Sequence, residues 1–97
     1  MENSDIAIKM TEALVKAGGT DKSVKFDFGD DGQIFASGTE ATTENNEADC
    51  TISVSKEDFV SLAEGNLDPM MAFMSGKLKV AGDMSVAMGL QTIFSNM

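Results

Sequence analysis

The stretch that most constrains the fold is residues 68–84, DPMMAFMSGKLKVAGDM, because it carries local signals for three successive elements. Asp68 followed by Pro69 predicts a helix start, since the carboxylate can accept hydrogen bonds from free backbone N–H groups and proline suits the first helical position. Residues 77–81 alternate polar and apolar side chains, which predicts a strand. A second helix is expected over residues 84–94.

The same part of the chain is unusually apolar. Residues 70–74 are all apolar, so the short helix has almost no polar face. In the following helix, apolar side chains spread over roughly 220° at about 100° per residue, well beyond the ~100° stripe that rests on a sheet. Six of the eight methionines lie in the last third of the chain. This segment either packs on two sides, as a Met-rich core or a dimer interface, or lines a hollow that adapts to several apolar shapes.

Upstream, periodicity and turn residues predict the other elements in order. A helix ended by Gly18 has a capping residue at Asn3 or Ser4. On this helix Ile8 and Val15 lie opposite the apolar stripe, where they either contact a crossing helix or, as we favour, are ordinary exposed apolar residues. A serine caps the helix that follows the fourth strand. The expected ranges are a helix over 5–17, strands over 24–28 and 33–37 joined by a hairpin turn at 29–32, an edge strand over 40–43, a strand over 50–54 and a helix from 56 to 64.

The length and composition predict one soluble globular domain over residues 1–97. The chain has 42% hydrophobic and 24% charged residues. No apolar run approaches the length of a transmembrane helix, and residues 1–5 lack the features of a signal peptide. A single cysteine fits a reducing cytoplasm. The net charge is −9 and arginine is absent, so we expect poor binding to nucleic acid and to anionic membrane surfaces.

The residues needed for common enzyme chemistry are missing. Histidine, the usual general base, is absent. Cys50 is expected on the inner face of a strand, where it is an inert core residue rather than a nucleophile. The acids Asp27, Asp30 and Asp31 do not have the spacing of an EF-hand, so they are interpreted as part of a turn. We therefore expect no enzyme activity, no metal and no cofactor.

Two runs in the second half resemble the sterol carrier protein type 2 family. Residues 68–91 are similar to its C-terminal signature, with a proline, an Ala-Phe pair, Gly-Lys-Leu-Lys and Ala-Met-x-Leu-Gln. Residues 48–69 resemble the family's ADCT strand, its serine-capped helix and its Gly-x-Leu-x-Pro turn. The resemblance implies an α/β (α+β) fold, with a five-stranded, mainly antiparallel sheet covered by helices. It also implies an apolar tunnel between the sheet and the helices.

The resemblance further implies a non-enzymatic intracellular carrier that binds a sterol, fatty acid, fatty acyl-CoA or phospholipid and makes transient contact with membranes or lipid enzymes. The chain ends without a peroxisomal tail, which favours a bacterial-type cytoplasmic protein. The alternative is a protein-interaction or assembly module that uses the Met-rich surface. The candidate cavity residues implied by the resemblance are Phe59, Leu62, Met70, Phe73, Met74, Leu78, Val80, Met84, Ala87, Met88 and Leu90.

Overall fold

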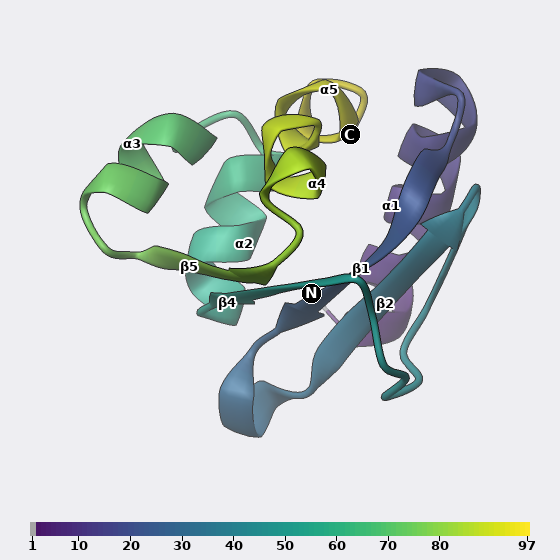
Figure 1. The fold of residues 1–97 in the computed structure, drawn as a ribbon, viewed down its shortest axis with the longest axis horizontal. Helices are drawn as coiled ribbons and strands as arrows, with labels where there is room; N and C mark the ends of the chain where they lie inside the picture. The colour runs from purple at the N-terminus through teal and green to yellow at the C-terminus, as the bar shows by residue number, and fades with distance from the viewer. Residues whose placement is uncertain (1) are drawn as a thin grey trace.

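The computed structural model describes residues 2–97, without the side chains of residues 87, 88, 90 and 91 (Figure 1). The helices and strands follow one another in the expected order, with one short 3₁₀ turn, η1, at the hairpin and the last helix divided in two. The elements are α1 (Asn3–Ala17), β1 (Thr20–Asp27), η1 (Gly29–Asp31), β2 (Gln33–Gly38), β3 (Glu40–Thr42), β4 (Cys50–Val54), α2 (Lys56–Ala63), α3 (Pro69–Met74), β5 (Leu78–Gly82), α4 (Met84–Met88) and α5 (Leu90–Ser95).

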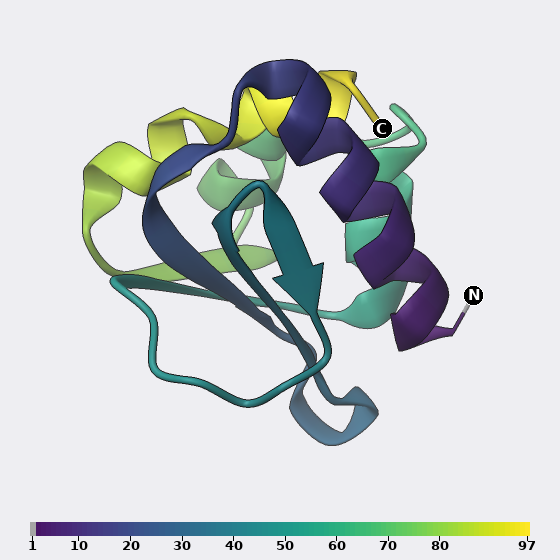
Figure 2. The ribbon, with the colours of Figure 1, turned by 90° about the vertical axis from the view of Figure 1, so that its right-hand side faces the viewer.

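Within the described residues the strands form one five-stranded sheet in the order β3-β2-β1-β4-β5. The pairs β1–β2, β2–β3 and β4–β5 are antiparallel, which confirms the mainly antiparallel expectation. The pair β1–β4 is parallel, with Val24 opposite Cys50, so the sheet is mixed. The parallel pair arises because residues 43–49 carry the chain back past the sheet before β4 begins (Figure 2).

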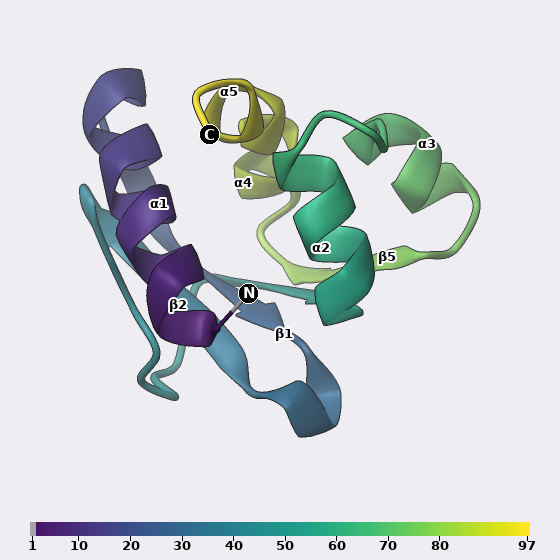
Figure 3. The same ribbon diagram turned by 180° about the vertical axis from the view of Figure 1, so that it is seen from behind.

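The two faces of the sheet differ in polarity. The register aligns Phe26 with Ile34 on one neighbouring strand and with Ile52 on the other, and all three side chains are buried. The intervening residues Lys25 and Thr51 belong to the opposite face and are half-buried. Helices gather on the apolar face, with α1 over β2 and β3 (Figure 3). The core therefore lies between this face and the helices, where a tunnel was expected.

The first helix begins earlier than expected, at Asn3. The prediction that Asn3 or Ser4 caps it is wrong, because Glu2 occupies the cap position and its side chain makes no capping hydrogen bond. The Asn3 side chain instead donates to the carbonyl of Asp31 over 2.7 Å and ties the helix to the hairpin turn. Ile8 and Val15 are exposed, as predicted.

The predicted helix over residues 84–94 is two helices. Gly89 separates α4 from α5, and its N–H donates to the Val86 carbonyl over 3.1 Å, in the spacing of a turn. Glycine costs about 1 kcal/mol relative to alanine inside a helix, so interrupting the helix at this position costs little stability. The first strand also differs from its prediction, because β1 begins at Thr20 and its register shifts before Val24.

Candidate functional site

Aromatic rings fill the space between the sheet and the helices. The Phe59 ring on α2 lies at centroid distances of 5.0 Å from Phe26, 5.2 Å from Phe28 and 5.5 Å from Phe94. Phe26 and Phe94 are also in contact, with centroids 6.0 Å apart. All four side chains are buried. These four residues, called the aromatic layer below, connect β1 and the residue after it to α2 and α5.

The structure separates the eleven predicted cavity residues into groups by burial. Some of these residues are buried in the core, others are exposed at the surface, and Val80 is half-buried. The side chains of Ala87, Met88 and Leu90 lie outside the described residues. The buried group is Phe59, Leu62 and Leu78, and the exposed group is Met70, Phe73, Met74 and Met84.

The exposed group lies mainly on α3, whose predicted start is confirmed. The Asp68 carboxylate accepts a hydrogen bond of 2.9 Å from the Met70 N–H, and Pro69 occupies the first turn. Only Ala72 of this helix is buried. The structure thus brings Phe59 and Leu62 into the core, whereas it places the apolar side chains of α3 at the surface.

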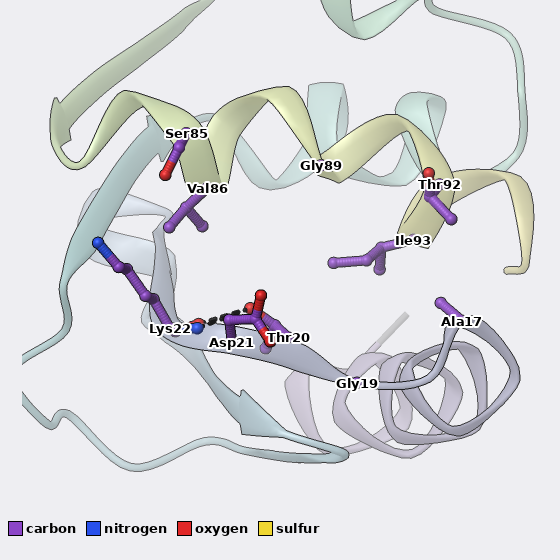
Figure 4. A pocket seen from close by; sticks show the side chains of 10 residues that line it. All are labelled: Ala17, Gly19, Thr20, Asp21, Lys22, Ser85, Val86, Gly89, Thr92 and Ile93. Atoms are coloured by element: carbon purple, nitrogen blue, oxygen red, sulfur yellow. Dashed lines mark hydrogen bonds between the residues drawn. The ribbon is translucent and has the colours of Figure 1, made fainter.

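One opening of about 340 Å³ lies between the start of β1 and the last two helices (Figure 4). Its lining is partly polar, with Lys22 on one side and Ser85 on the other. The lining residues from the end of α1 and the start of β1 are Ala17, Gly19, Thr20, Asp21 and Lys22. Those from α4 and α5 and the glycine between them are Ser85, Val86, Gly89, Thr92 and Ile93.

An ion pair lies beside this opening. The Lys22 ammonium donates to the Asp83 carboxylate, which also accepts from the Ser85 hydroxyl over 2.6 Å and from the Ser85 N–H over 2.9 Å. The hydrogen bond from Lys22, together with those from Ser85, holds the pKa of Asp83 well below its usual range. The same hydrogen bond raises the pKa of Lys22. Asp83 therefore ties the start of α4 to β1.

A second opening of about 560 Å³ lies between α1, the end of α2 and α5. Its apolar lining consists of Val60, Ala63, Phe94 and Met97, while Lys9 and Glu64 supply charges. This volume is within the ~300–1,000 Å³ range of small-molecule sites.

The helix α5 separates the two openings, since Ile93 lines the first and its neighbour Phe94 lines the second. Both side chains are buried. Sequence reasoning placed Ile93 and Phe94 in the wide apolar arc of the last helix but did not include them among the cavity residues. The sequence did contain a signal for them. Adjacent residues on a helix point in different directions, so two adjacent large apolar side chains cannot both contact the same part of a sheet.

Cys50 is buried and its position on the inner sheet face is confirmed. Burial raises the pKa of its thiol. In the described part of the chain, no three side chains of the metal-binding types come together. None of the helices in that part has the length and apolarity that a membrane crossing requires.

Comparisons with known proteins agree with this geometry. The model of the SCP-2 sterol transfer family matches residues 5–95. Hydroxysteroid dehydrogenase-like protein 2 of Bos taurus is 45% identical over 53 residues, which are 55% of this chain but only 13% of that protein. The chain thus spans a small part of this curated relative.

Solved structures share the fold. The sterol carrier protein domain 2 of Helicoverpa armigera has a TM-score of 0.71 and 25% identity, covering 94% of this chain and 84% of that one. The Aedes aegypti sterol carrier protein 2 in complex with palmitate has a TM-score of 0.79 and 12% identity, covering 100% and 97%. The fold and the family match together confirm the resemblance seen in the sequence, and the chain belongs to the SCP-2 sterol transfer family.

Proposed function

We propose that the chain is a lipid carrier that holds the hydrocarbon of a fatty acid, or of a related long-chain lipid, between α5 and the rings of Phe26 and Phe59. The observation that carries the proposal is the position of Phe94, which is buried against Phe26 and Phe59 and yet lies on a six-residue helix with an opening on either side. Membership of a sterol transfer family supports this function. The palmitate bound by the Aedes protein of the same fold supports the choice of a fatty acid.

The covering helix α5 is easy to displace. A helix this short is not stable by itself in water, so its position depends on what its side chains contact. Among the described side chains of α5, Ile93 and Phe94 are the buried ones. A hydrocarbon chain that enters beneath α5 would replace the apolar surface that Phe94 loses, because burial of apolar area is not specific for its source. Exchange of a side chain for a lipid tail would therefore cost little free energy.

The second opening is the better entrance for the tail. Its lining includes Val60, Ala63 and Met97 together with Phe94 of the aromatic layer, whereas the first opening has the Lys22–Asp83 ion pair beside it. The Lys9 ammonium at the second opening is a suitable partner for a carboxylate. Phe59 and Leu62 would then form the floor of the bound state. Ala87, Met88 and Leu90 stay candidate wall residues.

The test compares Phe94→Ala with Phe28→Ala. Each substitution removes a buried ring that packs on Phe59, so each should cost about 3–5 kcal/mol of stability. We expect Phe94→Ala to raise the affinity for a fluorescent C16 fatty acid, because the tail takes the vacated space, whereas Phe28→Ala leaves the affinity unchanged. Denaturant melts and lipid titrations are measured on both variants.

A second variant covers the case in which neither alanine variant folds. Val60 is half-buried at the second opening. Val60→Trp should fill that opening and weaken fatty acid binding, while Val15→Trp on the exposed side of α1 should not. Equal affinities for the two tryptophan variants would exclude this entrance. Failure of the unmodified protein to bind any fatty acid, sterol, acyl-CoA or phospholipid would exclude the carrier function itself.

The alternative function is an assembly module that binds a partner protein through its Met-rich surface. The exposed methionines of α3 favour it. Native mass spectrometry of gently purified protein separates the two functions. A bound lipid mass supports the carrier, and a lipid-free chain that forms a tight complex only with another protein supports the module.

A further inference from the structure

The helix α3 presents apolar side chains to solvent over most of its surface. The exposed fractions are 64% for Met70, 61% for Met71, 44% for Phe73 and 76% for Met74. Only Ala72 is buried, and through it the helix packs toward β5. These four exposed residues are called the α3 patch below. Large contiguous apolar surfaces on soluble proteins mark sites of interaction.

The α3 patch occupies one end of the molecule. In both Figure 1 and Figure 3, α3 lies at the end opposite α1, beside the strand β5. β5 is an outer strand of the sheet. A flat partner can therefore approach this end without contacting α1 or the hairpin.

The charges of the chain are distributed unevenly in a way that favours this end. Of the sixteen acidic residues, only Asp83 lies in residues 69–97. Asp83 is itself paired with Lys22. Lys77 and Lys79 follow the α3 patch directly and are exposed. Residues 69–82 thus carry two positive charges and no negative one, with the α3 cap Asp68 just before them, in a chain with a net charge of −9.

The exposed apolar residues of α1 do not have an excess of positive charge beside them. Val15 on α1 is also exposed, but the same helix carries Asp5 and Glu12 as well as two lysines. Its surface alternates in charge, which suits solvent rather than a negatively charged surface.

We propose that the α3 patch, with Lys77 and Lys79, is a docking surface for the interface of a phospholipid bilayer that contains anionic lipids. Methionine and phenylalanine side chains enter the boundary between headgroups and acyl chains, as in other helices that lie in the interface. The two lysines keep their ammonium groups among the anionic headgroups.

The overall negative charge does not prevent docking at this end. The Debye length is about 8 Å at physiological ionic strength, so acidic residues farther than this from the docking surface are largely screened, and Asp68, which caps α3, is the acid that adjoins this surface in the sequence. The expectation of poor membrane binding used the net charge and the absence of arginine. The distribution of charge over the surface changes that expectation for one end of the molecule. The docking surface does not depend on the proposed cargo site, because none of its residues lines either opening.

The first experiment uses a single tryptophan as a reporter, since the chain contains no tryptophan or tyrosine. Phe73→Trp places the reporter in the α3 patch, and Val15→Trp is the control on α1. Vesicles contain phosphatidylcholine and phosphatidylglycerol, with or without bromine on the acyl chains. We expect a blue shift and quenching for Phe73→Trp only. Equal quenching of the two reporters, or none for Phe73→Trp, would overturn the proposal.

The second experiment measures flotation of the protein with the same vesicles. Met71→Gln combined with Met74→Gln changes only exposed side chains, so folding should be retained. Lys77→Glu with Lys79→Glu should weaken binding about tenfold or more, and added salt should reduce this difference. The control Lys16→Glu with Lys25→Glu changes the net charge equally, away from α3, and should have a small effect. Similar losses for the two charge variants would contradict a localised surface.

Other occupants of the α3 patch give different results. Uptake of a brominated lipid as cargo would quench the reporter without co-flotation of the protein. Self-association would appear in sedimentation velocity as a dimer that the Met71→Gln, Met74→Gln variant lacks. Either result, in the absence of flotation, would replace the bilayer as the occupant.

Discussion

The rings of Phe59 and Phe94 meet edge to face, with centroids 5.5 Å apart and planes inclined at 70°. This contact joins the helix α2 to α5, two elements that are far apart in the sequence. It also places the last helix over the inner face of the sheet, because both rings contact Phe26 on β1. The contact therefore helps to hold α5 over this face.

A double-mutant cycle should detect this contact. Phe59→Leu and Phe94→Leu each keep an apolar side chain but remove the ring. We expect a coupling free energy of about 0.5–1.5 kcal/mol between them, which is typical of aromatic pairs. The measurement is denaturant unfolding of the wild type, both single variants and the double variant. Ile8→Ala, at an exposed site on α1, is the control and should be additive with Phe59→Leu.

The side-chain caps of α2 and α3 should have equal costs but different consequences. The Ser55 hydroxyl accepts from the Asp58 N–H over 3.1 Å, and Asp68 caps α3. Replacement of either by alanine should cost about 1 kcal/mol. Only Asp68→Ala should also weaken vesicle flotation, because it loosens the helix that carries the α3 patch. Unchanged flotation of a correctly folded Asp68→Ala variant would show that docking does not need an ordered α3.

The Cys50 thiol should react slowly in the folded protein. Its side chain is fully buried on the inner face of β4, and burial raises the thiol pKa, so both access and thiolate content are low. The measurement is the rate of labelling by a thiol reagent, with and without denaturant. Ser53→Cys in a Cys50→Ala background places a thiol at an exposed position on the same strand and should label rapidly. Comparable rates in the folded state would contradict the assigned strand face.

The protein should lose stability in acid as the Asp83 carboxylate becomes protonated. Its pKa is lowered in the folded state, so its hydrogen bonds to Lys22 and Ser85 stabilise the fold at pH values above the unfolded pKa of about 3.9. This contribution is lost as the pH falls from there toward the lower pKa of the folded state. Asp83→Asn should therefore be less stable than the wild type at pH 7, and the difference should shrink by pH 3. A difference that is constant between these pH values would show that the carboxylate charge is unimportant.

Local sequence signals predicted the elements well, because their causes are local. The alternation at Cys50, Ile52 and Val54 identified the inner face of β4, and all three residues are buried. Asp68 and Pro69 identified the start of α3 for the same reason. Such signals need only the chain within a few residues, so they can be recognised without knowing what packs against them.

Contacts between segments that are distant in the sequence could not be predicted from such local signals. The parallel pairing of β1 with β4 depends on the path of residues 43–49, and no local pattern encodes it. Periodicity gave residues 70–74 an apolar surface, but whether that surface is covered depends on which elements lie nearby. The predicted set of cavity residues therefore contains both Phe59, which is buried, and Met74, which is exposed. Phe94 was missed because its contacts with Phe26 and Phe59 come from distant segments.

The parallel pair at the centre of the sheet has a consequence for the order of folding. β1 gains its first neighbour through the adjacent hairpin with β2, a local contact with a low entropic cost of loop closure. Its second neighbour is β4, which reaches it only after β3 and the intervening loop. We expect the hairpin to form early and the docking of β4 onto β1 to limit the folding rate, since non-local pairing is slow. Until that step the free edge of β1 presents unpaired backbone groups to other chains, so aggregation during refolding should originate at the central strand.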